Sequence, residues 1–532
     1  MGGRQVYNYF IVKESLTGRR LVFLVLAVII VAGLLLSNRI FSADAFTKEE
    51  GQHALYGYWL LHDLNACDLK SFFYDTQRQM VWPFLHSWIL SFFFIFFGAS
   101  MVSARLLSLF IFVASLGLMY LLSRQFSEEK GDAIGTFSIL LALTSPLMLR
   151  FATENMLEGL GGLLFLAVAY GYTLCEGRKI TAPYIILAML MGLSIYTNYL
   201  YAYLLIPAYL VATLSNLAPF FFQTLRLSKK GEKAAIPFIW WTYRKMIVLV
   251  VLLLFAALWF SFSAPRKIML LLDSIFRYSG GVTPDLWQGL IFYPKIIIDQ
   301  ISFSPWLGLL MLVSLFLPFI AVPFRGLDKL FIYVWTTLLL LTLTVPTKAA
   351  QLIYVIMPFI FIISATAFLL LWERAKNRSR GLATGLVLAV FCAILFYLPN
   401  LYAQYFPNLP KQNMAQVLAF FRDNVPRQES VAASLNLTHL NPENVQFAFR
   451  GWEKPVFIEN LPEELELYEK AKIFLTVDMD RNSRYATEII DDSLYRWNAL
   501  LRDKEKAGKI RLRAFRKFEE MGVTAKVYQR LY

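Results

Sequence analysis

Long apolar runs recur along the first 400 residues of the chain. From residue 21 to residue 398, segments of about 16 to 22 mainly apolar residues alternate with short loops that hold Gly, Pro and charges. A helix that crosses a bilayer needs about 20 mostly apolar residues. The candidate spans are residues 21–38, 83–98, 103–122, 134–149, 156–174, 182–197, 200–217, 246–264, 303–323, 330–345, 351–372 and 382–399. The pattern predicts an α-helical polytopic membrane protein.

The basic residues reduce the twelve candidates to eleven crossings. If every candidate crossed, the basic loops around residues 178–179, 229–233 and 374–380 would face away from the basic N-terminus. The positive-inside rule rejects that arrangement. The segment 83–98 is the one expected not to cross, because it is short, begins with Pro83 and carries His86 and Trp88 as an interfacial helix does. We therefore expect about 11 transmembrane helices, a cytoplasmic N-terminus and an extracytoplasmic C-terminus.

The chain is expected to divide near residue 402. Residues 1–402 form the transmembrane part, with outer loops over 39–102 and 265–300, and residues 403–532 have the composition of a soluble domain. In that domain the pattern predicts helices over 414–421 and 492–506 and strands over 456–458 and 473–477. We expect a small α/β domain on the outer face, without a Gly-rich phosphate loop or a nucleophile elbow.

Composition supports the membrane assignment and excludes a nucleic-acid role. Hydrophobic residues make up 58% of the 532 and charged residues only 17%. The net charge of +14 comes from loops between spans, where cations orient a membrane protein. The three cysteines are widely spaced, so no disulfide framework or metal knuckle follows from them.

The first outer loop holds the strongest candidate for catalysis. Glu49 and Glu50 stand beside His53, followed by apolar residues on a helix face that can lie along the membrane. Burial and a like-charged neighbour both raise the pKa of a carboxyl group toward the range of a general base. The alternative is a structural one, in which acids at a helix start simply favour the positive end of the dipole.

Other polar residues near the expected outer boundary are candidates for binding. Carboxylates at a membrane boundary are functional candidates by default, and cations there suit a lipid phosphate. These candidates are Arg78, His86, Arg150, Glu154, Glu158, Arg266, Lys267, Arg277, Tyr278 and Lys348. The alternative for each is an ordinary interfacial residue, and for Glu154 an ion pair with Arg150.

Several motifs resemble one family of membrane enzymes. The sequence EEGQHA is followed by WPFLHSW and by FFGASMVSARLLSLFIFVASL. These blocks resemble the GT-C type membrane glycosyltransferases, and in particular the protein O-mannosyltransferase and lipid A aminoarabinose transferase (glycosyltransferase family 39-like) family. The matching positions are Glu49, Glu50, Pro83, His86, Gly98, Ser100, Arg105 and Ser108, and the stretch 348–358 is similar to a later element of the family.

The resemblance implies transfer of a sugar from a polyprenyl-phosphate donor to a protein, lipid or polysaccharide acceptor at the outer face, by one inverting displacement. It implies a catalytic base at Glu49, support from Glu50 and His53, and phosphate contacts from cations of the outer rim. Glu158 is a candidate second carboxylate. No cofactor is predicted, although a divalent cation is compatible with such a site.

Two positions depart from the family pattern. Glu49 stands where the family has Asp, so either Glu49 or Glu50 remains a candidate base. Gln351 and Leu352 stand where the family has Arg and Tyr, which leaves Lys348 as the cation of that element. Two other functions stay open: a secondary transporter or lipid flippase, and a noncatalytic scaffold with an outer binding domain. Midspan positions almost free of charge favour the enzyme over the transporter.

Overall fold

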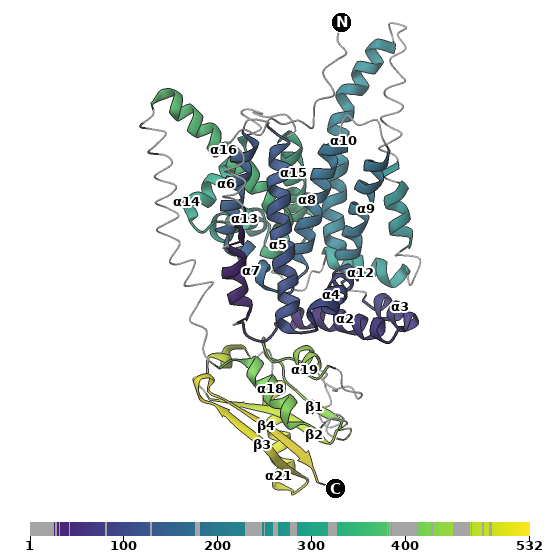
Figure 1. Ribbon diagram of the computed structural model, residues 1–532, viewed down its shortest axis with the longest axis vertical. Coiled ribbons are helices and arrows are strands. Elements are labelled where there is room, and N and C mark those ends of the chain that lie inside the picture. Colours follow the sequence, from purple (N-terminus) through teal and green to yellow (C-terminus); the bar gives the residue numbers. More distant parts are fainter. Residues whose placement is uncertain are drawn as a thin grey trace. The chain divides into compact units, whose positions relative to one another are not determined.

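The computed structural model describes most of the chain (Figure 1). The residues described are 26, 29–30, 32–41, 43–79, 82–127, 130–175, 181–228, 247–248, 250–258, 264–276, 285–317, 327–379, 381, 385, 412–426, 429–450, 469, 471–480, 483–488 and 492–531. Their contacts divide the chain into two units that are not consecutive in sequence. One unit comprises residues 1–38, 77–86 and 108–405, and the other comprises 39–76, 87–107 and 406–532.

The first unit is helical. Its elements are the greater part of α5 (Met101–Arg124), then α6 (Gly131–Leu143), α7 (Pro146–Thr153), α8 (Glu158–Cys175), α9 (Ala182–Thr197), α10 (Tyr199–Ser228), α12 (Ala264–Phe276), α13 (Leu286–Ile296), a π-helical turn η1 (Ile297–Ile301), α14 (Pro305–Ser314), α15 (Leu327–Leu343), η3 (Ala350–Ile356) and α16 (Met357–Arg378). Helix α8 packs against α9, α9 against α10, and α10 against α15. Helix α16 packs against α6 and α15.

Three helices among the described residues are long and apolar enough to cross a membrane. They are Met101–Arg124, Glu158–Cys175 and the combined segment Ala350–Arg378. A fourth crossing results if α6 and α7, which meet at 73°, form one broken span. The bend occurs at Ser145, whose hydroxyl accepts from the backbone N–H of Met148, and at Pro146, which starts the second helix.

The expected total of eleven crossings stays a prediction. The basic positions of the N-terminus and of the loops around 178–179 and 229–233 lie outside the described residues. Helix α4 (Leu85–Phe97) has 13 residues, which corresponds to about 20 Å, whereas the hydrocarbon core is about 30 Å thick. Its length agrees with the interfacial role expected for segment 83–98.

Two adjacent glycines let α8 approach its neighbours closely. A Cβ added to Gly161 would lie 2.6 Å from the ring of Tyr201, and one added to Gly162 would lie 3.0 Å from the ring of Tyr354. Small residues allow this close packing of helices in membranes, where dispersion contacts replace the hydrophobic drive. Tyr201 belongs to α10 and Tyr354 to η3, so α8 approaches both elements at these glycines.

The second unit combines the first loop with the C-terminal chain. It contains α2 (Lys48–Asn65), α3 (Leu69–Gln77) up to residue 76, most of α4 and the first turns of α5. The C-terminal elements are α18 (Met414–Asn424), β1 (Val431–Ala433), α19 (Pro442–Ala448), β2 (Ile473–Met479), α21 (Ser493–Lys506), β3 (Ile510–Phe518) and β4 (Val523–Arg530). The sheet order is β1-β2-β4-β3, with β1 parallel to β2 and the other pairs antiparallel.

Each face of the sheet is covered by one helix. Val417 and Phe421 of α18 share a core with Val527 of β4, whereas Trp497 of α21 packs on the other face with Phe474 of β2. The predicted helices over 414–421 and 492–506 and the strand over 473–477 correspond to α18, α21 and β2. The predicted strand 456–458 lies outside the described residues. Strands β3 and β4 were not anticipated.

A half-buried carboxylate on β2 makes this unit sensitive to acid. Burial alone would raise the pKa of Asp478, but hydrogen bonds and charge from Lys526 and Arg502 outweigh it, so the pKa is lowered. The ion pairs measure 2.5 Å from Lys526 and 3.0 Å from Arg502. A lowered pKa in the folded state adds stability that is complete above the unfolded pKa, about 4, and is lost as the pH falls through the folded value.

We expect Asp478→Asn to remove part of the acid sensitivity. At pH 7 the variant should unfold at a lower temperature than the wild type, because two cations lose their carboxylate partner. The difference should shrink as the pH falls below about 4, where the wild-type carboxylate becomes protonated. Thermal unfolding of the purified chain between pH 3 and pH 7 measures this. A constant difference over that range would contradict the assigned role of Asp478.

Candidate functional site

The start of α2 is defined by a reciprocal cap. Thr47 is the N-cap residue, and its hydroxyl accepts from the backbone N–H of Glu50 at 3.4 Å. The Oε2 atom of Glu50 accepts in turn from the backbone N–H of Thr47 at 2.9 Å. A threonine followed three residues later by glutamate forms this capping box because both unpaired backbone donors are then satisfied. The first helical turn therefore carries Glu49 in a fixed place.

A buried arginine holds the same glutamate from another helix. Arg105 of α5 donates from Nε to Oε1 of Glu50 at 2.8 Å and from Nη2 to Oε2 at 2.9 Å. Its exposed fraction is 5% and that of Glu50 is 1%. The remaining donors reach the backbone, with Nη1 2.7 Å from the carbonyl of Asp44 and Nη2 3.3 Å from that of Ala45. Such fork-like pairing is the strongest geometry available to a guanidinium.

The sequence before Arg105 explains why the arginine is placed so well. Gly98 adopts φ +72°, the left-handed region that glycine tolerates, and α5 begins three residues later. Ser100 accepts from the backbone N–H of Ser103 at 3.0 Å, while Ser103 accepts from the backbone N–H of Ser100 at 3.0 Å. Ser103 also donates to the carbonyl of Gly98 at 2.6 Å. The G-x-S…R block is thus a helix cap that aims Arg105 at Glu50.

The C-terminal elements hold the loop that precedes α2. Asp44 accepts from the backbone N–H of Met414 at 2.7 Å and from the hydroxyl of Tyr485 at 2.5 Å. The Nδ1 atom of His439 lies 3.0 Å from the carbonyl of Ala45, and the side-chain amide of Asn444 donates to the carbonyl of Phe46. Three consecutive residues are therefore anchored by the C-terminal chain.

Gly51 is needed where α2 meets α19. A Cβ at this position would lie 3.0 Å from Oδ1 of Asn444 and 3.1 Å from Cβ of Glu443. The glycine of the EEG motif therefore allows close packing of two helices. Burial raises the pKa of the Glu443 carboxyl, and the charge of Lys48 opposes that rise.

The two adjacent glutamates occupy different environments. Both oxygens of Glu50 accept hydrogen bonds inside the protein, from Arg105 and from the backbone of Thr47. Glu49 is half-buried, and His53, one turn further on, is buried with an exposed fraction of 3%. Glu50 is thus bound as a structural carboxylate, and Glu49 has partial access to solvent.

The other candidate residues belong to the first unit. Arg150 and Glu154 form the expected ion pair, with Nε 3.0 Å from Oε1. Glu158 begins α8 and is buried, as is His86, whereas Arg78 and Arg266 are exposed. Lys267 is buried on α12, and burial lowers the pKa of its ammonium to about 8. Arg277 and Tyr278 lie outside the described residues.

Lys348 caps the end of α15. Its Nζ donates to the carbonyls of Leu341 at 2.6 Å and Thr342 at 2.8 Å, and also to that of Val345. An ammonium group has three N–H donors, so all of them are used on the backbone. Cations stabilise the negative end of a helix in this way. Burial also lowers the pKa of Lys348.

We expect Lys348→Met to act on stability rather than on donor binding. Three carbonyls, two of them in buried hydrogen bonds, would lose their donors, at about 1–3 kcal/mol for each buried unsatisfied group. The variant should therefore unfold at a lower temperature. If Lys348 instead binds a lipid phosphate, the KM for the donor should rise while the unfolding temperature stays the same. Thermal unfolding and donor titration of the same preparation separate these results.

Within the described residues, no group of three or more His, Cys, Asp or Glu side chains is arranged to hold a metal ion. The site also contains residues that the sequence did not single out. Asp44, Tyr485 and Asn444 had no motif to mark them. Arg105 belonged to a quoted motif, but nothing local assigned it a partner 55 positions earlier.

Part of the chain matches a known family. Residues 82–227 match the model of the dolichyl-phosphate-mannose-protein mannosyltransferase family. No curated protein sequence matches the chain significantly.

Solved structures match over nearly the whole length. ArnT from Cupriavidus metallidurans bound to undecaprenyl phosphate has 14% identity and a TM-score of 0.59, covering 96% of this chain and 98% of that one. The apo form of ArnT has 12% identity and a TM-score of 0.58 over the same shares of the chains. The oligosaccharyltransferase of Archaeoglobus fulgidus tethered to an acceptor peptide has 11% identity and a TM-score of 0.51, covering 96% of this chain and 74% of that one.

The likeness to solved structures shows the fold alone. The family match adds a similarity in sequence over the segment that contains α4, α5 and Arg105. The matched segment includes the WPFLHSW and G-x-S…R blocks. Residues 82–227 are thus similar to the dolichyl-phosphate-mannose-protein mannosyltransferase family, and the fold of the chain is similar to that of ArnT, a likeness that fits a GT-C type membrane glycosyltransferase.

Proposed function

We propose that this protein transfers a sugar from a polyprenyl-phosphate donor to an acceptor hydroxyl at the extracytoplasmic face, with Glu49 as the base. The observation that carries the proposal is the buried pair of Glu50 and Arg105, because it fixes the first turn of α2 and leaves the neighbouring carboxylate half-buried with access to solvent. The bound undecaprenyl phosphate of the similar ArnT structure and the acceptor peptide of the archaeal transferase support a lipid-phosphate donor and a separate acceptor.

The reaction is a single displacement. The Glu49 carboxylate takes the proton of the acceptor hydroxyl as the acceptor oxygen forms a bond to the anomeric carbon. The bond from that carbon to the phosphate oxygen breaks, and the lipid phosphate leaves with the electron pair. One attack from the face opposite to the leaving group inverts the anomeric configuration.

Cations of the outer rim complete the proposal. A leaving phosphate is stabilised by positive charge placed where the negative charge develops. Arg266 and Lys267 of α12 and, from the sequence, Arg277 are the cations proposed for this contact. Lys348 is the weakest candidate in this set because its three donors already bind carbonyls. Glu158 and His53 are proposed to orient substrate near the base.

The test is a transfer assay. Membranes that carry the protein should move radiolabelled sugar from undecaprenyl-phosphate monosaccharides, hexosyl and pentosyl, into an endogenous acceptor. Membranes without the protein provide the control. The product should have the anomeric configuration opposite to that of the donor. Movement of the labelled lipid across the membrane without a new glycosidic bond would instead identify a flippase.

A further inference from the structure

The hairpin of β3 and β4 is strongly basic. Between residues 509 and 530 the chain carries seven Lys and Arg side chains and two glutamates. Strand β3 lies at the edge of the sheet, and most of its residues are exposed.

An irregularity in β3 gathers three arginines on one face. Arg511 pairs with Gln529, Leu512 with Tyr528 and Ala514 with Val527, so Arg513 is an extra residue between the last two pairs. Because such a bulge adds one residue to the strand, the side chains that follow it point to the face opposite to the one that strict alternation would give them. Arg511 and Arg516, which is opposite Ala525, therefore both lie on the face that α18 covers. Arg513 joins them, since its Nη1 donates to Oε1 of Gln529 at 3.2 Å.

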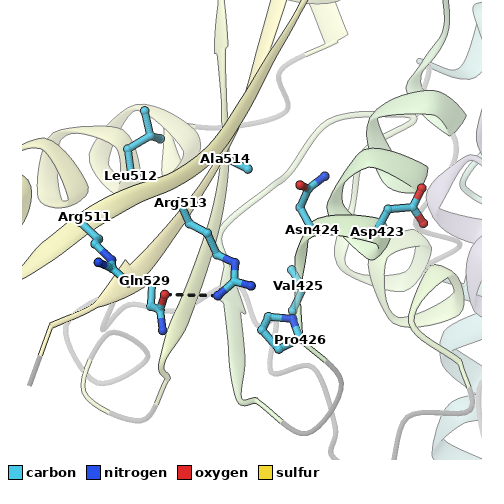
Figure 2. A pocket seen from close by; sticks show the side chains of 9 residues that line it. All are labelled: Asp423, Asn424, Val425, Pro426, Arg511, Leu512, Arg513, Ala514 and Gln529. Carbon is cyan, nitrogen blue, oxygen red and sulfur yellow. Dashed lines mark hydrogen bonds between the residues drawn. The ribbon is translucent and has the colours of Figure 1, made fainter.

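These arginines border a recess beside the C-terminal end of α18. The open pocket has a volume of about 660 Å³ and is lined mainly by polar atoms, with Asp423, Asn424 and Pro426 on one side and Arg511, Arg513 and Gln529 on the other. The Asp423 carboxylate is paired with Arg422, whose Nε lies 3.2 Å from Oδ1. Figure 2 shows the guanidinium of Arg513 projecting from β3 toward Val425 and Pro426. A second hollow of about 360 Å³ continues along α18, where Gln416, the ring of Phe420 and Arg516 line it.

We propose that this recess binds an anionic saccharide chain, with carboxylate or phosphate groups on Arg511, Arg513 and Arg516. Guanidinium groups bind both anions through paired hydrogen bonds. The amides of Asn424, Gln416 and Gln529 each offer a donor and an acceptor, which suits sugar hydroxyls. The half-buried Phe420 adds an apolar surface beside them.

Two other kinds of partner fit this surface less well. An acidic peptide that added a strand to the β3 edge would need regular backbone pairing, which the bulge at Arg513 interrupts. A membrane surface is contacted by protruding basic and apolar side chains. The exposed Phe515 lies on the other face of β3, and the arginines line a recess.

This site deepens the proposed function. If the protein transfers a sugar, an anionic glycan held by the C-terminal elements is the acceptor class, and that step rests on the proposal above. Binding of a glycan to the recess can be measured without a sugar donor and without transfer. The failure of the recess proposal can therefore be distinguished from the failure of the proposed transfer activity.

The experiment measures binding to the full chain in detergent. The probes are oligogalacturonate, polyglycerol phosphate, neutral dextran and polyglutamate, titrated at low salt and at 0.5 M NaCl. We expect binding of an anionic glycan, weakened by salt, with Arg511→Gln/Arg516→Gln reducing affinity at least about tenfold. The carboxylated and phosphorylated probes show which anion the recess prefers. Dextran should not bind.

A matched variant controls for net charge. Lys506→Gln/Lys509→Gln removes the same charge from exposed positions of this unit that do not line the recess, and it should bind as the wild type does. Equal losses in both variants would overturn the proposal in favour of general electrostatic attraction. The proposal would also be overturned if polyglutamate bound as tightly as the glycans, or if anionic vesicles displaced the glycans through the same arginines. It would likewise fail if neither anionic glycan bound.

Discussion

Glu49→Gln is expected to lower the rate of sugar transfer by about 10²- to 10⁴-fold, the contribution of a positioned general base. The substitution keeps the size of the side chain but removes its ability to take a proton. Because both oxygens of the neighbouring Glu50 carry the contacts that hold the helix start, the fold should survive the change. The assay is initial rate with saturating donor, beside the unfolding temperature of the same preparation.

Two variants make this result specific to the carboxylate. Glu49→Asp retains a base and restores the residue type that the related family carries here, so it should keep measurable transfer. Glu50→Gln removes charge from a buried pair and should lower the unfolding temperature as well as transfer. Undiminished transfer by Glu49→Gln would rule out Glu49 as the base, and transfer that survives in both Gln variants would rule out a base at either position.

The sequence located the loop of the candidate base but not what holds that loop. The motif EEG places two acids at a helix start, and local spacing alone left both as candidates. Their difference comes from Arg105, which is 55 positions away, and from anchors on Asp44 and Phe46 that are nearly 400 positions away. Local periodicity carries no information about such partners, so only the folded chain separates a structural carboxylate from an accessible one.

The elements of the C-terminal chain show the same limit. Helix α18 and strand β2 bury a continuous apolar set, and their patterns were therefore readable. Strand β3 reads IRLRAFRKF, and its bulge and exposed edge position remove the alternation by which a strand is recognised. The contacts of residues 44–46 link the first loop to the C-terminal chain. The division near residue 402 stays a prediction.

Arg105→Met is expected to destabilise the chain by about 3–5 kcal/mol, the usual effect of removing one partner from a buried ion pair. Glu50 would remain charged and buried, and the carbonyls of Asp44 and Ala45 would lose their donors. Arg105 acts through Glu50 on the helix start that carries Glu49, so it is a positioning residue. Its loss should reduce kcat with little effect on the KM for the donor. Denaturant titration and initial rates measure the two effects.

A second substitution distinguishes positioning from stability. In Arg105→Met/Glu50→Leu no buried charge is left alone, and replacing such a pair by apolar residues is often neutral. The double variant should therefore regain much of the lost stability. Transfer should stay low, because the backbone N–H of Thr47 and the carbonyls of Asp44 and Ala45 still lack the partners that set the helix start. If transfer recovered together with stability, Arg105 would serve only to neutralise Glu50. If the destabilising effects of the two changes added together, the two residues would not be coupled.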